Sequence, residues 1–134
     1  TQAESSAASD VYKRQIEVFR ERAERRVPLI HYAKGSGHLH EAIRTLDIDA
    51  LSLDWRDDLR ANRASFGDRF AFQGNLDPSR MHGTPEAART AAQRLLNEAG
   101  DAPGHVFNLG HGFAPGAQID CVEAVLRLIT GESA

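Results

Sequence analysis

The chain has 134 residues, a formal net charge of −3 and 41% hydrophobic residues, which is the size and composition of one globular domain. The mildly acidic charge gives no electrostatic case for binding nucleic acid or an anionic membrane, and no apolar run approaches the roughly 20 residues that span a bilayer. The single cysteine, Cys121, excludes an internal disulfide and a cysteine-based metal cluster, and fits a reducing compartment. We therefore expect a soluble, cytoplasmic protein.

The first fifteen residues differ from the rest of the chain. They are small, polar and aperiodic, and then basic. The stretch from Ser5 to Gln15 resembles a translated adaptor scar, so residues 1–15 are interpreted as an artefactual or disordered segment. The fold is then expected to occupy residues 16–134.

From Ile16 onward, helical and strand patterns alternate. Amphipathic spacing and end signals predict helices over Ile16–Arg26, about His38–Leu46, about Asp57–Ser65, Pro85–Ala99 and Ile119–Thr130. The clearest helix start has Thr84 as N-cap and Pro85 at the first helical position. Short apolar runs predict strands over Pro28–Ala33, Ala50–Leu53, Phe70–Gln73 and Val106–Leu109.

Four short strands, each followed by a helix, predict an α/β fold with a parallel sheet. The strands are apolar nearly throughout, so we expect both faces of the sheet to be covered. In such folds, chemistry lies at the carboxyl ends of the strands. In this chain those ends carry Lys34, Asp54, Asn75 and the turn Gly110-His111-Gly112.

His111 is the main candidate among these residues, because its glycine neighbours let a ligand approach the backbone and its imidazole donates or accepts hydrogen bonds. Residue type alone leaves open a histidine that caps its own loop. For Asp54 and Asn75 a structural role is favoured, since such side chains commonly bond local backbone. Lys34 either adds positive potential at the site or is solvated.

The order and spacing of these strand ends resemble the C-terminal part of the uroporphyrinogen decarboxylase family. The resemblance spans about Ile16 to Ile129 and rests on Leu53-Asp54-Trp55, Gly67-Asp68, Gln73-Gly74-Asn75-Leu76-Asp77-Pro78 and Phe107-Asn108-Leu109-Gly110-His111-Gly112. It implies a (β/α)8 TIM barrel, of which this chain would form the C-terminal half, four parallel βα units.

The resemblance also implies a function. Members of the family remove carboxyl groups from the four acetate side chains of uroporphyrinogen III, giving coproporphyrinogen III in haem biosynthesis, and they work as homodimers without a cofactor. His111 matches the family's substrate-binding histidine, and Gly110, Gly112, Lys34, Asp54 and Asn75 are candidates for lining the same pocket. The family's other substrate-binding residues belong to its N-terminal half, so no catalytic residue and no metal ligand is expected in this chain.

Two alternatives stay open. One is an incomplete, inactive fragment that folds only by association, because four βα units leave two unpaired strand edges. The other is a zinc- and cobamide-linked methyltransferase of the same superfamily, which would need a cysteine two residues after His31 and another near His111. Neither cysteine is present, which disfavours zinc chemistry.

The remaining residues that could carry chemistry are assigned to the surface or to packing. His38, His40, His82 and His105 are interpreted as surface histidines, and Trp55 as a packing residue. The arginines between positions 20 and 26 are interpreted as a solvated helix face. Cys121 is expected inside the last helix as an inert apolar side chain.

Overall fold

A computed structural model describes residues 2–32, 34–35, 39–101 and 103–132, and for residues 2–9, 40 and 41 it describes the backbone alone. Within these ranges a parallel sheet is formed by β1 (Ile30–Tyr32), β2 (Ala50–Ser52), β3 (Ala71–Gln73) and β4 (His105–Val106). The strand order, β1-β2-β3-β4, is the order of the sequence. The predicted parallel α/β fold is therefore confirmed, with each βα unit placing its strand beside the previous one.

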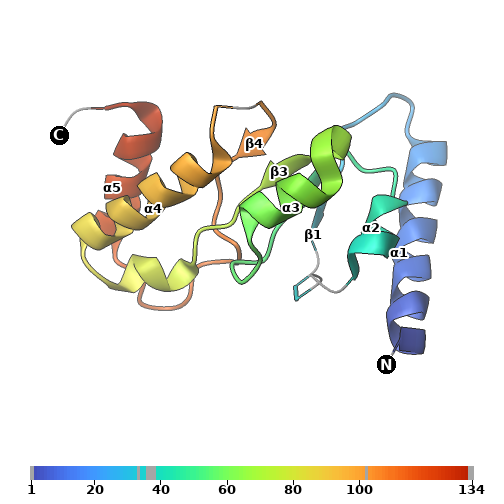
Figure 1. Cartoon of the computed structure of the whole chain (residues 1–134), viewed down its shortest axis with the longest axis horizontal. Helices are drawn as coiled ribbons and strands as arrows, with labels where there is room; N and C mark the ends of the chain where they lie inside the picture. Colours follow the sequence, from blue (N-terminus) through green and yellow to red (C-terminus); the bar gives the residue numbers. More distant parts are fainter. Residues whose placement is uncertain (1, 33, 36–38, 102, 133–134) are drawn as a thin grey trace.

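The helices alternate with these strands. They are α1 (Gln2–Arg22), α2 (His40–Arg44), α3 (Leu59–Phe66), α4 (Pro85–Ala99) and α5 (Ile119–Thr130), together with the short 3-10 helices η2 (Gly67–Arg69) and η3 (Pro78–His82). In Figure 1, α3 and α4 lie in front of the sheet, and α1 and α5 lie at opposite ends of the molecule. No described helix is both long enough and apolar enough to cross a membrane.

The end signals of α4 act as predicted. The Thr84 hydroxyl oxygen accepts a hydrogen bond from the Ala87 backbone N–H at 3.3 Å, and Pro85 begins the helix. The predicted bounds of α4 and α5 are confirmed. The strands are shorter than predicted, and η3 was missed, because a single 3-10 turn has no apolar periodicity to read.

The core lies between the sheet and its helices. Leu51 and Phe72 occupy the centres of β2 and β3 and are fully buried, as is Leu59 at the start of α3. Ala88 and Ala92 face this core from α4 without any exposed surface, so the small side chains let that helix approach closely. Each large side chain that is buried here stabilises the fold by about 1.5–3 kcal/mol.

The expectation that all strands are covered on both faces is wrong for the edge strands. Ile30 on β1 is 52% exposed and Val106 on β4 is 46% exposed. β2 and β3 have a neighbour on each side, whereas β1 and β4 each have one within the described sheet. The two edge strands therefore carry apolar side chains in contact with solvent.

Helix α1 also differs from its prediction. It begins at Gln2 rather than Ile16 and ends at Arg22 rather than Arg26. Arg20 is no solvated residue, since its guanidinium contacts the Asp49 carboxylate at 2.6 Å and the Asp47 carboxylate at 3.1 Å. These bonds attach α1 to the turn before β2. The division of the chain at residue 16 stays a prediction.

Candidate functional site

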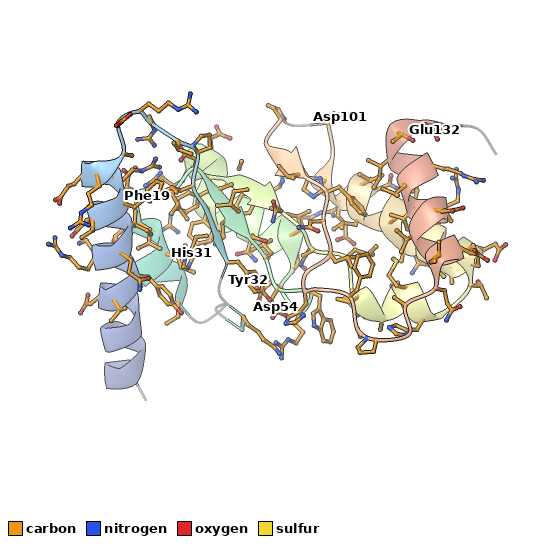
Figure 2. The ribbon with its side chains drawn as sticks, turned by 180° about the vertical axis from the view of Figure 1, so that it is seen from behind. Phe19, His31, Tyr32, Asp54, Asp101 and Glu132 are labelled. Atoms are coloured by element: carbon orange, nitrogen blue, oxygen red, sulfur yellow. The ribbon has the colours of Figure 1, made fainter. Side chains whose placement is uncertain are left out.

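The loops at the carboxyl ends of the strands converge at one edge of the sheet. Pairing between the third and fourth segments continues beyond β3 and β4, since the Gly110 N–H donates to the Leu76 carbonyl at 2.8 Å and Leu76 bridges Leu109. Figure 2 shows Tyr32 and Asp54 at this edge and Asp101 at the opposite one. The turn that holds His111 is thereby fixed beside the ends of the other strands.

A cavity of about 320 Å³ opens at this edge. It brings together three of the predicted candidates, Lys34, His111 and Gly112, from the first and fourth strand ends. The rest of its lining consists of Trp55, Asp77, Pro78, Ser79, His82 and Ala114. Because Lys34 is a cation and the imidazole of His111 can donate a hydrogen bond, this lining suits an anionic ligand.

Asp54 is buried and is not among the residues that line this cavity. Its side chain is 1% exposed, and its two carboxylate oxygens accept hydrogen bonds from the Arg56 guanidinium at 2.8 and 2.9 Å. The backbone N–H groups of Arg56 and Gly35 donate to the same carboxylate. Above all, the Arg56 side chain holds the pKa of Asp54 well below its usual range, against the effect of burial. Asp54 is therefore an ionised group that joins the first two strand ends, the structural role favoured from the sequence.

The Asn75 side chain likewise forms hydrogen bonds with the backbone. Its side-chain amide donates to the carbonyl of Asp54 at 2.8 Å and to that of Asp57 at 2.6 Å, and it is buried. It borders a different cavity of about 380 Å³, between η3 and α4. Its contacts fix the loop after β2 against the loop after β3, again the structural role favoured from the sequence.

The two glycines that flank His111 have different surroundings. A Cβ on Gly110 would lie 2.5 Å from Cα and 2.7 Å from Cβ of Trp55, whereas a Cβ on Gly112 would meet nothing within 4 Å. The expectation that both glycines make room for a ligand is thus wrong for Gly110. At Gly110 the group that lies close to the backbone is Trp55 of the same chain.

Tyr32, at the end of β1, is a contact of His111 that sequence reasoning missed. Its ring lies edge-on to the His111 ring, with 6.5 Å between centroids and 72° between planes. Its hydroxyl donates to the Gly110 carbonyl at 3.3 Å. Burial, and then the Asp54 carboxylate, raise the pKa of Tyr32, so the hydroxyl stays a donor at neutral pH. Tyr32 ends β1 and Gly110 follows β4, strands at opposite edges of the sheet, so the loops that converge across its end bring them together.

Two other lining residues are ones for which the sequence predicts a surface or packing role. His82 ends η3 and borders the cavity, and Trp55 is 42% exposed, with its indole under the Arg56 guanidinium. By contrast, His105 uses its Nε2 in a 2.8 Å hydrogen bond with the Gly74 carbonyl. Cys121 is buried in α5, as expected, and its thiol contacts the Gly83 carbonyl. His38 lies outside the described residues.

Comparisons with known proteins identify the family to which the sequence is similar. The family model for uroporphyrinogen decarboxylase (URO-D) matches residues 6–131. The chain is 42% identical to the uroporphyrinogen decarboxylase of Coxiella burnetii over 84% of its own length and 31% of the relative. The corresponding values for the Pseudomonas fluorescens enzyme are 43%, 84% and 32%, and for the Azoarcus sp. enzyme 48%, 72% and 27%. The chain spans about a third of the length of the curated relatives it matches.

Proposed function

Because the chain belongs to the uroporphyrinogen decarboxylase family, we propose that it forms part of an enzyme that converts uroporphyrinogen III into coproporphyrinogen III. This reaction removes the carboxyl groups of four acetate side chains. The observation that carries the proposal is the cavity shared by Lys34 and His111 at the carboxyl ends of parallel strands, where such barrels hold their substrates.

The reaction makes clear what this site contributes. Protonation of a pyrrole ring carbon gives an electron-poor cation. The bond between the acetate methylene and its carboxylate then breaks, and its electron pair enters the ring as CO₂ leaves. A second proton completes the methyl group, and the proton on the ring carbon leaves to restore the aromatic pyrrole. The remaining carboxylates must be held meanwhile. His111 donates a charge-assisted hydrogen bond to one of them, and Lys34 adds positive potential.

The site described here holds substrate and does not supply the proton. We propose that the residues which stabilise the ring cation belong to the rest of the barrel, so the isolated chain is inactive. A homodimer and a cytoplasmic location follow from the same family membership. Turnover of uroporphyrinogen III by the purified chain would show that the essential residues have been misjudged.

A chimaera tests the proposal. This chain would replace the matched third of the Coxiella burnetii relative, and the porphyrinogen products would be separated after oxidation to porphyrins. We expect coproporphyrin to accumulate, and His111→Gln to lower kcat/KM by about 10–100-fold, the effect of losing one charge-assisted hydrogen bond. A folded chimaera without turnover, or an unaffected His111→Gln variant, would contradict the proposal.

The methyltransferase alternative gains no support. Cys121 is fully buried in α5 and its thiol contacts Gly83, away from the lining of the His111 cavity. Within the described residues, no group of three or more histidine, cysteine, aspartate and glutamate side chains is arranged to hold a metal ion.

A further inference from the structure

His82 lines the same cavity as His111 and Lys34, although it comes from a different segment of the chain. It is the last residue of η3, the short helix after β3, whereas His111 follows β4. We propose that His82 is a second carboxylate-binding residue of this cavity, which takes another acidic side chain of the same substrate. The proposal rests on the proposed function, because it assumes a ligand with several carboxylates.

The chain holds His82 beside the loop that follows His111. The Gln118 backbone N–H donates to the Met81 carbonyl at 2.7 Å, which ties the end of that loop to η3. A Cβ on Gly116 would lie 3.8 Å from both Cε1 and Nδ1 of His82, so the imidazole packs along the loop. His82 is exposed and lines the cavity, and the hydrogen bond between Gln118 and Met81 holds its segment against that loop.

The hydrogen-bond donors around the cavity suit an anion. Among the described residues, its ionisable lining side chains are Lys34, Asp77, His82 and His111. Asp77 is the only carboxylate among them, and one of its oxygens accepts a hydrogen bond from the Ser79 backbone N–H at 2.9 Å. The Lys34 ammonium and the two imidazole rings can donate hydrogen bonds to the carboxylates of a ligand.

The other histidines with described side chains are placed differently. His105 is engaged with the Gly74 carbonyl, and His31 is half-buried with its ring edge-on to Tyr12. Neither belongs to the cavity lining. His82 is thus the one among these that can share a ligand with His111.

The test is the binding of uroporphyrin III, the fluorescent oxidised octacarboxylate, to the chimaera described above at pH 7. His82→Gln should weaken the binding by about 5–30-fold, because the glutamine amide is only a neutral donor. His82→Lys should bind about as well as the parent, because it supplies a cationic donor at the same place. The matched control is Arg89→Gln, which removes a cation from the exposed surface of α4 outside the cavity and should bind like the parent.

The outcomes separate the two proposals. If His111→Gln loses affinity and His82→Gln does not, the assignment of His82 is wrong and the proposed function stands. If neither variant changes the affinity, or if the parent chimaera does not bind, both the assignment and the role of the cavity in the proposed function fail. Circular dichroism of each variant checks that His82→Gln and His82→Lys remain folded, as substitutions of an exposed residue should.

Discussion

The backbone of Gly110 lies directly against Trp55, so closely that a Cβ on Gly110 would be 2.5 Å from the Trp55 Cα. The two residues follow β4 and β2, which are not neighbours in the sheet because β3 separates them. Their contact means that the two loops meet across the end of β3. This closure fixes one side of the turn that carries His111.

Gly110→Ala should therefore destabilise the chain by about 1–3 kcal/mol, since the backbone at Trp55 has to move to admit the methyl group. Gly112→Ala is the matched control. Its Cβ would meet nothing within 4 Å, so the free energy of unfolding should change by less than about 0.5 kcal/mol. Urea unfolding followed by the fluorescence of Trp55, the single tryptophan, measures both. Equal unfolding midpoints for the two variants would contradict the close contact.

The Asp54 carboxylate predicts a stability that depends on pH. The pKa of Asp54 is depressed in the folded chain, chiefly by Arg56, so its contribution is fully present above the unfolded pKa of about 3.9 and is lost as the pH falls further. Asp54→Asn should cost about 1–3 kcal/mol at pH 7, because the donors that face this buried carboxylate lose a charged acceptor.

The comparison between Asp54→Asn and the parent is made by urea unfolding at pH 7, 5 and 3. The difference in the free energy of unfolding should be the same at pH 7 and pH 5 and smaller at pH 3. Asp68→Asn, on an exposed 3-10 helix, serves as the control for removing a carboxylate and should give little difference at any pH. A difference for Asp54→Asn that grows on acidification would show that the carboxylate does not have a lowered pKa.

What could be read from the sequence was local. The start of α4 at Thr84 and Pro85 and the end of α5 before Gly131 depend on residues within one turn, and both were predicted to the residue. The parallel sheet followed from the alternation of patterns. His82 was assigned to the surface because its place in the cavity depends on the tie between Gln118 and Met81, which lie 37 positions apart in the printed sequence. No local pattern contains such a contact.

The glycines around His111 show the same limit in another way. Their small size was read correctly as a sign of close approach, but the partner of Gly110 is Trp55, brought there by the order of the strands. Likewise, Asp54 follows a strand, which is the position of a residue that faces a ligand. Its two carboxylate oxygens nevertheless accept hydrogen bonds from the Arg56 guanidinium. Sequence position identified the edge where the site lies, and tertiary contacts decided which side chains are available there.

Tyr32→Phe should change the position of the turn that carries His111 and lower the stability of the fold only slightly. The variant removes the hydrogen bond to the Gly110 carbonyl and keeps the aromatic ring, so the free energy of unfolding should fall by about 0.5–1.5 kcal/mol. The ring proton signals of His111 in NMR spectra should shift, because the turn that carries it relaxes. Those of His31, whose ring contact is with Tyr12, serve as the internal reference. Unchanged His111 signals would mean that the hydroxyl does not position the turn.

The exposed apolar residues of the edge strands predict that the chain associates. Ile30 and Val106 lie on β1 and β4, where unpaired backbone groups and apolar side chains together favour pairing with another chain. Sedimentation velocity should reveal species larger than the monomer whose share grows with concentration. Ile30→Lys and Val106→Lys should each weaken this association by about tenfold, because a charge at a strand edge opposes pairing. Val11→Lys, the same kind of change at an exposed position on α1, should leave it unaltered. A monodisperse monomer that unfolds cooperatively would contradict the prediction, and would mean that four βα units are stable without a partner at either edge.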